Sequence, residues 1–88
     1  MKTEFKNSFL KELQKLKDQS LKDAIFQVII DVENATNLND IPNIKKLKGY
    51  SNYFRIRVKD YRIGLKLENE TLFFVTFDHR KDIYKRFP

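Results

Sequence analysis

The spacing of apolar residues changes once along this chain of 88 residues, and that change restricts the fold more than any other feature. Up to about residue 36 the large apolar side chains recur every three or four positions, which is typical of helices with one buried face. From residue 53 apolar and polar residues alternate, which is typical of strands. Helices followed by strands predict an α+β domain in which the helices cover one face of a sheet.

Two amphipathic helices are expected in the first part of the chain. The first spans residues 7–16, with Asn7 or Ser8 as its N-cap. The second opens with Ser20-Leu21-Lys22-Asp23, which fits a capping box, and continues towards Ala35. Because only three residues separate them, the helices should form an antiparallel hairpin that packs its apolar face on the sheet.

Three runs of strand character follow an irregular connector at residues 37–49, in which Pro42 prevents a helix. The runs cover residues 53–59, 61–67 and 71–77. Short turns between them predict two consecutive hairpins and therefore a small antiparallel sheet. The third run is apolar on both faces and should lie inside the sheet, and residues 2–5 are a candidate edge strand.

The composition supports a single domain, residues 1–88, and excludes several kinds of chemistry. With 41% hydrophobic residues, including eight Phe, the chain can form a core despite its 34% charged residues. It has no cysteine and one histidine, so disulfides, thiol nucleophiles and the usual zinc sites are excluded, and neither a metal nor another cofactor is expected. No signal-peptide pattern or run of ~20 apolar residues occurs, which predicts a cytoplasmic protein that does not enter membranes.

Positive charge is concentrated in the second half of the chain. Residues 1–42 carry six Lys or Arg against seven Asp or Glu, a net charge of −1, whereas residues 43–88 carry twelve against five, a net charge of +7. This asymmetry predicts a polyanionic partner for the strand-rich half. Lys45, Lys46 and Lys48 are either part of a solvated basic loop or direct contacts to RNA.

A two-residue turn at Lys59-Asp60 would place Arg57 opposite Arg62, and Arg55 opposite Gly64, on one face of the sheet. Like charges in direct opposition repel each other, because their Cβ atoms are only about 4.5–5.5 Å apart. The pairing therefore destabilises the sheet locally, but it forms a surface that is suited to binding an anion. The cationic face expected from this register has no acidic member and consists of Tyr53, Arg55, Arg57, Lys59, Arg62 and Lys66.

Two details of the cationic face have alternative interpretations. Gly64 either leaves a bare patch where a ribose or phosphate approaches the backbone, or marks a bulge or bend. A three-residue loop in the second hairpin would place Arg80 on the face of Arg57 and Arg62, whereas a two-residue loop would place it on the other face.

Three segments of the chain together resemble the RelE/ParE toxins of type II toxin–antitoxin modules. They are Lys46-Leu47-Lys48-Gly49, Tyr53-Phe54-Arg55-Ile56-Arg57-Val58-Lys59-Asp60-Tyr61-Arg62-Ile63 and His79-Arg80-Lys81-Asp82-Ile83-Tyr84. The resemblance covers nearly the whole chain, including the helices before the sheet. It implies a metal-independent endoribonuclease that inhibits translation by cleaving mRNA in the ribosomal A site, where a ribose 2′-OH attacks the adjacent phosphate. It also implies a cognate antitoxin protein, with mRNA and ribosomal RNA as further partners.

The site residues follow from this resemblance by position. Arg62 and Arg80 are expected to stabilise charge on the phosphate, Arg57 to orient the 2′-OH, and Tyr84 to stack on a base. The residues expected to bind substrate around this catalytic set are Arg55, Lys59, Lys81 and His79. Arg55 and Arg57 stand where the RelE prototype has lysines, and an arginine cannot act as a general base. The histidine is either an acid or base of the reaction or a packing residue at the end of a strand.

Two other functions are compatible with the same residues. ParE-like members of the superfamily inhibit DNA gyrase without a ribonuclease site, and a shared fold does not separate the two activities. A non-catalytic nucleic-acid-binding module would use the same cationic face. The full set of four arginines with Tyr84 favours RNA cleavage.

Overall fold

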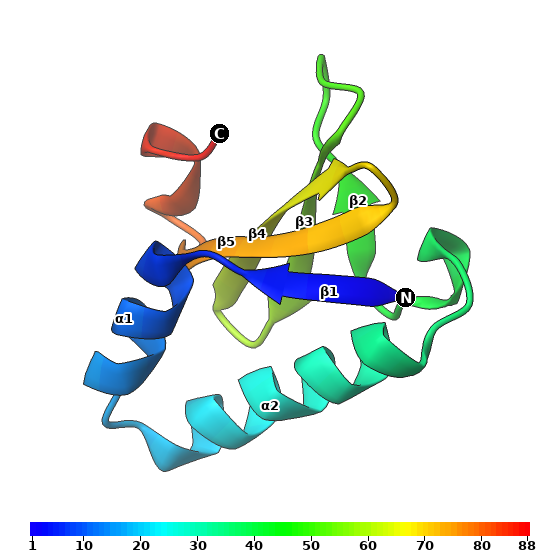
Figure 1. Cartoon of the computed structure of the whole chain (residues 1–88). Coiled ribbons are helices and arrows are strands. Elements are labelled where there is room, and N and C mark those ends of the chain that lie inside the picture. Colours follow the sequence, from blue (N-terminus) through cyan, green and yellow to red (C-terminus); the bar gives the residue numbers. More distant parts are fainter.

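The computed structural model describes residues 1–88, which form a five-stranded sheet with two helices on one face (Figure 1). The strand order is β1-β5-β4-β3-β2, so β4 is central and β5 lies inside the sheet, as expected. The elements are β1 (Lys2–Phe5), α1 (Asn7–Lys15), α2 (Gln19–Asn34), β2 (Ile44–Lys46), β3 (Tyr53–Val58), β4 (Tyr61–Glu68) and β5 (Thr71–His79), with short 3-10 helices η1 (Leu38–Asp40) and η2 (Ile83–Lys85). None of the helices is both long and apolar enough to span a bilayer.

Both predicted helices are confirmed, but their N-caps differ from the expected ones. Lys6 occupies the N-cap position of α1, and the hydroxyl of Ser8 donates instead to the carbonyl of Val75 at 2.5 Å. The N-cap of α2 is Asp18, whose carboxylate accepts a hydrogen bond from the Leu21 amide at 3.0 Å. A negative charge at the positive end of the helix dipole favours this cap over the neutral hydroxyl of Ser20.

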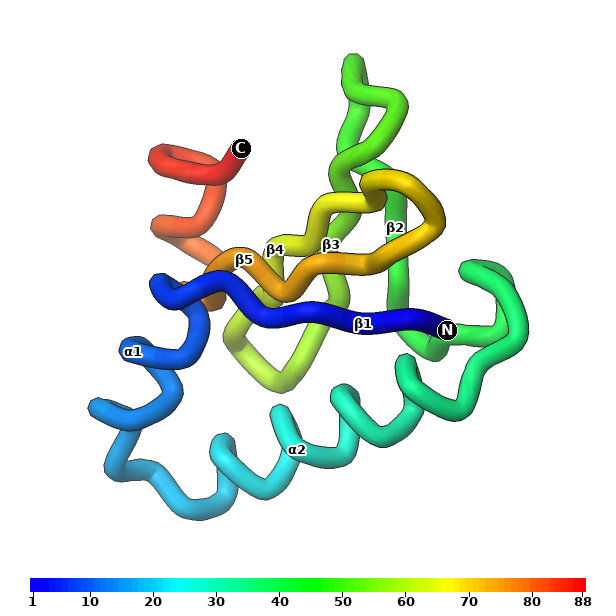
Figure 2. Tube along the Cα trace, in the orientation of Figure 1, coloured from blue at the N-terminus to red at the C-terminus, as the bar shows by residue number.

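Each helix packs more on the sheet than on the other helix. Helix α1 lies along β5, and α2 turns away from it to pass under β1 and β3 (Figure 1). The tube in Figure 2 shows the same course, with the C-terminal segment on the side of the sheet away from α2. The helices therefore cover one face of the sheet from β1 to β3.

Two expectations about the sheet were wrong. Strand β1 pairs in parallel with β5, so the sheet is mixed and not purely antiparallel. The connector also contains a strand, because β2 pairs antiparallel with β3 and forms the other edge. Only Ile44 in β2 is apolar, and three residues are too few to show an alternating pattern.

The main core lies between the helices and the sheet. It includes a group of packed rings, in which Phe74 is 5.0 Å from Phe5 and 5.3 Å from Phe9 between ring centroids. A second, smaller cluster on the opposite face joins Leu47 to the C-terminal residues Ile83 and Phe87. The C-terminal segment therefore covers part of the opposite face of the sheet.

A β-bulge decides the direction of Arg80. The turn between β4 and β5 has two residues, since Glu68 pairs with Thr71, and this turn alone would turn Arg80 towards the helices. However, the register shifts between Gly64 and Leu65, so that one residue of β5 has no partner. The shift reverses the side-chain alternation and returns Arg80 to the side of Arg62.

Candidate functional site

The predicted register between β3 and β4 is confirmed at every pair. Arg57 lies opposite Arg62, and Arg55 lies opposite Gly64. The pKa of the Arg62 guanidinium is lowered by burial and by the charges of Arg55, Arg57 and Arg80, whereas Tyr84 acts in the opposite sense. The four arginines and Tyr84, which we call the arginine cluster, therefore come together around Arg62. A guanidinium keeps its charge despite such a shift, so the cluster is a concentrated positive site.

Asn43 holds two members of the cluster in place. Its backbone carbonyl accepts a hydrogen bond from Arg55 Nη1, and its side-chain Oδ1 accepts one from Arg57 Nη2, each at 3.2 Å. Asn43 has φ 63°, in the left-handed region that asparagine tolerates better than most residues. Sequence reasoning missed this residue, although Pro42 followed by Asn suits the centre of a tight turn.

Arg62 is anchored by main-chain oxygens at the β3–β4 turn. Its Nη1 donates to the carbonyl of Tyr61 at 2.9 Å and to that of Lys59 at 3.2 Å. These contacts use one nitrogen of a group with five N–H donors, which leaves the others for an anion. A fixed guanidinium beside three further cations can bind a phosphate in a defined orientation.

The side chains of Lys59 and His79 are directed away from the arginine cluster. The Lys59 ammonium donates to the Ser20 hydroxyl at the start of α2, so its expected place on the cationic face was wrong. The ring of His79 packs edge-on against Tyr61 at 5.6 Å, on the helix side of the sheet, and its Nδ1 accepts a hydrogen bond from the Lys81 amide at 3.2 Å. This geometry agrees with the packing interpretation of His79. Lys81 itself is exposed in the turn after β5.

The remaining members of the expected face have partners of their own. Lys66 forms an ion pair with Glu68 at 3.0 Å and lies over the ring of Tyr53 at 5.7 Å. The hydrogen bond and charge of Glu68 raise the pKa of this lysine. The face also has two acids that were not expected, because Glu68 lies on the side of Lys66 and Asp78 lies opposite Arg62 across β4 and β5.

Gly64 lies beside the bulge and is also covered. It pairs with Thr76, next to the unpaired residue of β5, and the ring of Phe87 lies so close that an added Cβ would be 2.7 Å from ring carbons. The interpretation of Gly64 as a bare patch for a ribose or phosphate is therefore wrong, because an aromatic ring of the C-terminal segment fills this space. Glycine is needed at this position for that close approach.

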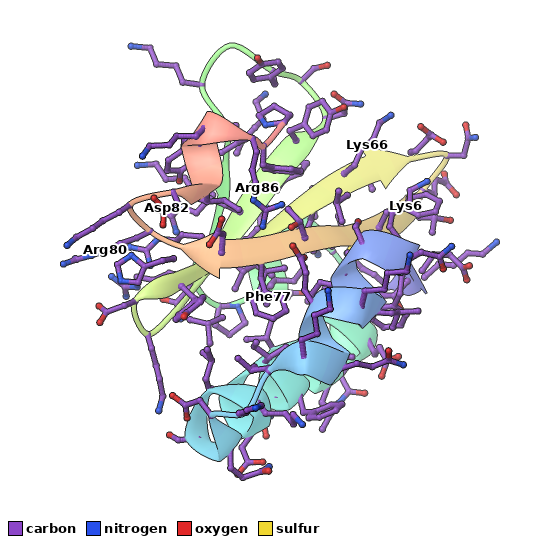
Figure 3. All side chains as sticks on the ribbon, turned by 90° about the vertical axis from the view of Figure 1, so that its left-hand side faces the viewer. Lys6, Lys66, Phe77, Arg80, Asp82 and Arg86 are labelled. Carbon is purple, nitrogen blue, oxygen red and sulfur yellow. The ribbon has the colours of Figure 1, made fainter.

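Arg86 fastens the C-terminal segment to the body of the domain. Its Nε donates to Asp78 Oδ2 and its Nη2 to Glu12 Oε2, both at 2.9 Å, and Nη2 also reaches the carbonyl of Phe77 at 3.1 Å. Figure 3 shows Arg86 lying against β5, whereas Arg80 projects outward from the turn that follows this strand. We call Arg86, Asp78 and Glu12 the C-terminal clamp.

The pKa values within the clamp reflect these contacts. The hydrogen bond to Asp78 raises the pKa of Arg86 against the effect of its burial. Burial alone would raise the pKa of Asp78, but hydrogen bonds from Arg86 and from the His79 amide outweigh it and hold the pKa below its ordinary value. Sequence reasoning missed the clamp because Glu12 is distant in the chain from the other two residues, and no local pattern joins Asp78 to Arg86.

A recess of about 690 Å³ adjoins the arginine cluster, between the loop after β2 and the C-terminal segment, and both Arg55 and Tyr84 line it. A second recess of about 750 Å³, next to Met1 and the turn after β4, contains no residue of the cluster. No three His, Asp or Glu side chains converge where they could hold a metal ion.

Comparisons with known proteins give a consistent result. A family model described as "ParE toxin of type II toxin-antitoxin system, parDE" matches residues 3–84. The chain is 42% identical over 89 residues to Toxin RelE3 of Methanocaldococcus jannaschii, with all of both chains covered. The crystal structure of the RelB–RelE antitoxin–toxin complex from Methanococcus jannaschii matches with a TM-score of 0.75 and 40% identity, covering 96% of this chain and 98% of that one. The intact E. coli RelBE complex matches with a TM-score of 0.67 over 89% of this chain and 94% of that one, but at 20% identity this likeness concerns the fold alone.

Proposed function

The chain belongs to the RelE/ParE superfamily of toxins from type II toxin–antitoxin systems, and we propose that it is an endoribonuclease that cleaves mRNA in the ribosomal A site. The observation that carries the proposal is the arginine cluster, in which four guanidinium groups and a tyrosine gather around Arg62. A relative at 42% identity named as a RelE toxin supports the same choice.

In the proposed reaction the ribose 2′ oxygen attacks the adjacent phosphorus and the 5′ oxygen of the next nucleotide leaves. The products are a 2′,3′-cyclic phosphate and a 5′-OH, so the proton lost from the 2′-OH is balanced by the one gained at the leaving oxygen. Arg62 and Arg80 stabilise the charge that develops on the phosphoryl oxygens, and Arg57 orients the attacking group. Arg55 binds a neighbouring phosphate, and Tyr84 stacks on a base.

The contribution of the cluster is electrostatic, because guanidinium groups do not exchange protons at ordinary pH. A single well-placed donor to a developing oxyanion is worth about 10²–10³ in rate. In this proposal Lys81, which is exposed next to Arg80, contacts a phosphate of the RNA. Lys59 and His79 have no part in it, since both side chains are directed away from the cluster.

A cognate antitoxin is the proposed protein partner. The relative at 40% identity was crystallised as a toxin–antitoxin complex, which supports an antitoxin for this chain as well. The exposed positive charge of the arginine cluster suits an acidic segment of such a protein. Messenger RNA and ribosomal RNA are the proposed nucleic-acid partners.

Inhibition of DNA gyrase is the second candidate function, because the family model that matches residues 3–84 is described as a ParE toxin. The two functions differ in what the arginine cluster does. A nuclease requires the cluster for toxicity, whereas a gyrase inhibitor without a ribonuclease site does not require it for chemistry. A non-catalytic nucleic-acid-binding module would instead bind RNA in a salt-dependent way and leave it intact.

Expression of the wild type and of an Arg62→Ala/Arg80→Ala variant tests these alternatives, with growth and the 5′ ends of mRNA recorded together. A Lys11→Ala/Lys17→Ala variant is the matched control, because it removes the same charge from exposed positions outside the cluster. The nuclease proposal requires growth arrest and new 5′-OH ends with the wild type and the control, and neither with the cluster variant. Arrest with intact messages and a DNA-damage response would support gyrase inhibition instead.

A further inference from the structure

The recess beside the arginine cluster combines aromatic and cationic side chains. Its volume of about 690 Å³ lies within the range of ~300–1,000 Å³ that is usual for small-ligand sites. The lining includes four cations, Lys45, Lys46, Lys48 and Arg55, and no acidic side chain. Two tyrosines, Tyr50 and Tyr84, also line the recess and are 47% and 55% exposed.

Tyr50 is held on the wall of the recess by its local backbone. Its amide donates to the carbonyl of Leu47 at 3.2 Å and closes a turn whose third residue, Gly49, has φ 87°. Such turns need glycine at the position with positive φ. The turn therefore determines where the ring of Tyr50 emerges from the loop.

Packing orients the Tyr50 ring as well. It lies edge-on to Tyr53, with ring centroids 5.5 Å apart, and Tyr53 lies edge-on to Phe87 at 5.6 Å. Tyr50 belongs to neither hydrophobic cluster, and nearly half of its surface is exposed despite these contacts. A single exposed aromatic needs no explanation. A fixed one that shares a recess with a second tyrosine and four cations is suited to a nucleic-acid base.

We infer that this recess is a second base-binding subsite, in which Tyr50 stacks on the RNA base next to the one bound by Tyr84. Arg55 belongs both to the arginine cluster and to the wall of the recess, so a strand with its phosphate on the cluster places the neighbouring nucleotide there. Aromatic rings that stack bases and cations that follow the phosphates are the usual means of binding single strands. The subsite deepens the proposed function, and rests on it for the identity of the ligand as RNA.

Fluorescence of RNA labelled with 2-aminopurine tests the subsite, because stacking on an aromatic ring quenches this base. The probes are 2′-fluoro hexanucleotides, which lack the attacking hydroxyl, with the label at each position in turn. They are used free and on ribosomes with an empty A site. The proteins are the wild type, Tyr50→Ala, Tyr50→Phe and Phe26→Ala, since Phe26 on α2 is also 47% exposed but lies outside the recess.

The wild type, Tyr50→Phe and Phe26→Ala should quench the label at a position where Tyr50→Ala does not, and Tyr50→Ala should bind about tenfold more weakly. Quenching by Tyr50→Ala at every position where the wild type quenches would overturn the inference, and so would an absence of quenching by the wild type. Cleavage of natural mRNA by the same proteins separates the two proposals. Tyr50-dependent quenching without cleavage would support the subsite and refute the nuclease proposal. Cleavage with quenching that does not depend on Tyr50 would support the nuclease proposal and refute the subsite.

Discussion

Replacement of Arg86 by methionine should weaken the attachment of the C-terminal segment. Methionine keeps a long apolar stem but loses the hydrogen bonds to Asp78, to Glu12 and to the carbonyl of Phe77. Ion pairs at partly exposed positions contribute only about 0.2–1 kcal/mol each, and the carbonyl bond adds about as much. The free energy of unfolding should therefore fall by about 2 kcal/mol, since both carboxylates are also left without their cation.

For a domain of this size, a loss of about 2 kcal/mol lowers Tm by roughly 8–16 °C. Differential scanning calorimetry of the wild type and of Arg86→Met at pH 7 measures this difference. Asp78→Asn and the double variant complete a thermodynamic cycle, in which the two changes should be clearly less than additive because the residues share one contact. A Tm within about 1 °C of wild type would refute the reasoning, and full additivity would refute the assignment to this ion pair.

The pH dependence of the same variant follows from the direction of the Asp78 shift. Its pKa is lower in the folded protein than in the unfolded chain, so its contribution to stability is present above about pH 4 and is lost as the pH falls through the folded pKa. Arg86 stays charged throughout this range, because its pKa is raised from an already high value. The Tm difference between wild type and Arg86→Met should therefore be large at pH 7 and small near pH 2. An equal difference at both values would contradict the ion-pair explanation.

Three further predictions concern single residues. Gly64→Ala should destabilise the domain by about 1–3 kcal/mol through the clash with the Phe87 ring, as measured by urea unfolding, and Phe87→Leu in the same chain should restore part of the loss. Asn43→Gly keeps the positive φ but removes the side-chain bond to its arginine, so RNA cleavage should fall about tenfold with little change in Tm, and an unchanged rate would exclude a positioning role. Asp18→Ala should cost about 1 kcal/mol through loss of the α2 cap, whereas Ser20→Ala should lower Tm less, and the reverse order would favour the capping box at Ser20.

The features that were predictable from the sequence depend on neighbours in the chain. The turn at Lys59-Asp60 joins two alternating runs directly, so the pairing of Arg57 with Arg62 follows from counting residues across it. The same reasoning failed for Arg80, because the bulge lies in the middle of the next hairpin and leaves no local pattern. The one-residue shift in register reverses the side of the sheet that the turn length alone would give to Arg80.

The packing of the C-terminal segment is the largest feature that the sequence did not predict, and this too has a physical reason. The position of Phe87 over Gly64 and of Arg86 between Asp78 and Glu12 depends on tertiary contacts between distant parts of the chain. Charge composition predicted a basic surface, but it did not distinguish cations that remain free from those that are paired within the domain. Arg86 counts towards the net charge as fully as Arg80 does, yet it is already committed to two carboxylates.

The unpaired residue in β5 makes the two ends of this strand independent of each other. Phe74 and Phe77 both belong to the main core although three positions separate them, which an unbroken strand does not allow. If Val75 were instead paired in a regular ladder, strict alternation from Phe74 would turn Phe77 outward, while Asp78 and Arg80 would turn towards the helices. One unpaired residue thus allows the two parts of the strand to be directed separately. Phe74 and Phe77 both pack in the core, while Asp78 and Arg80 remain on the outer face.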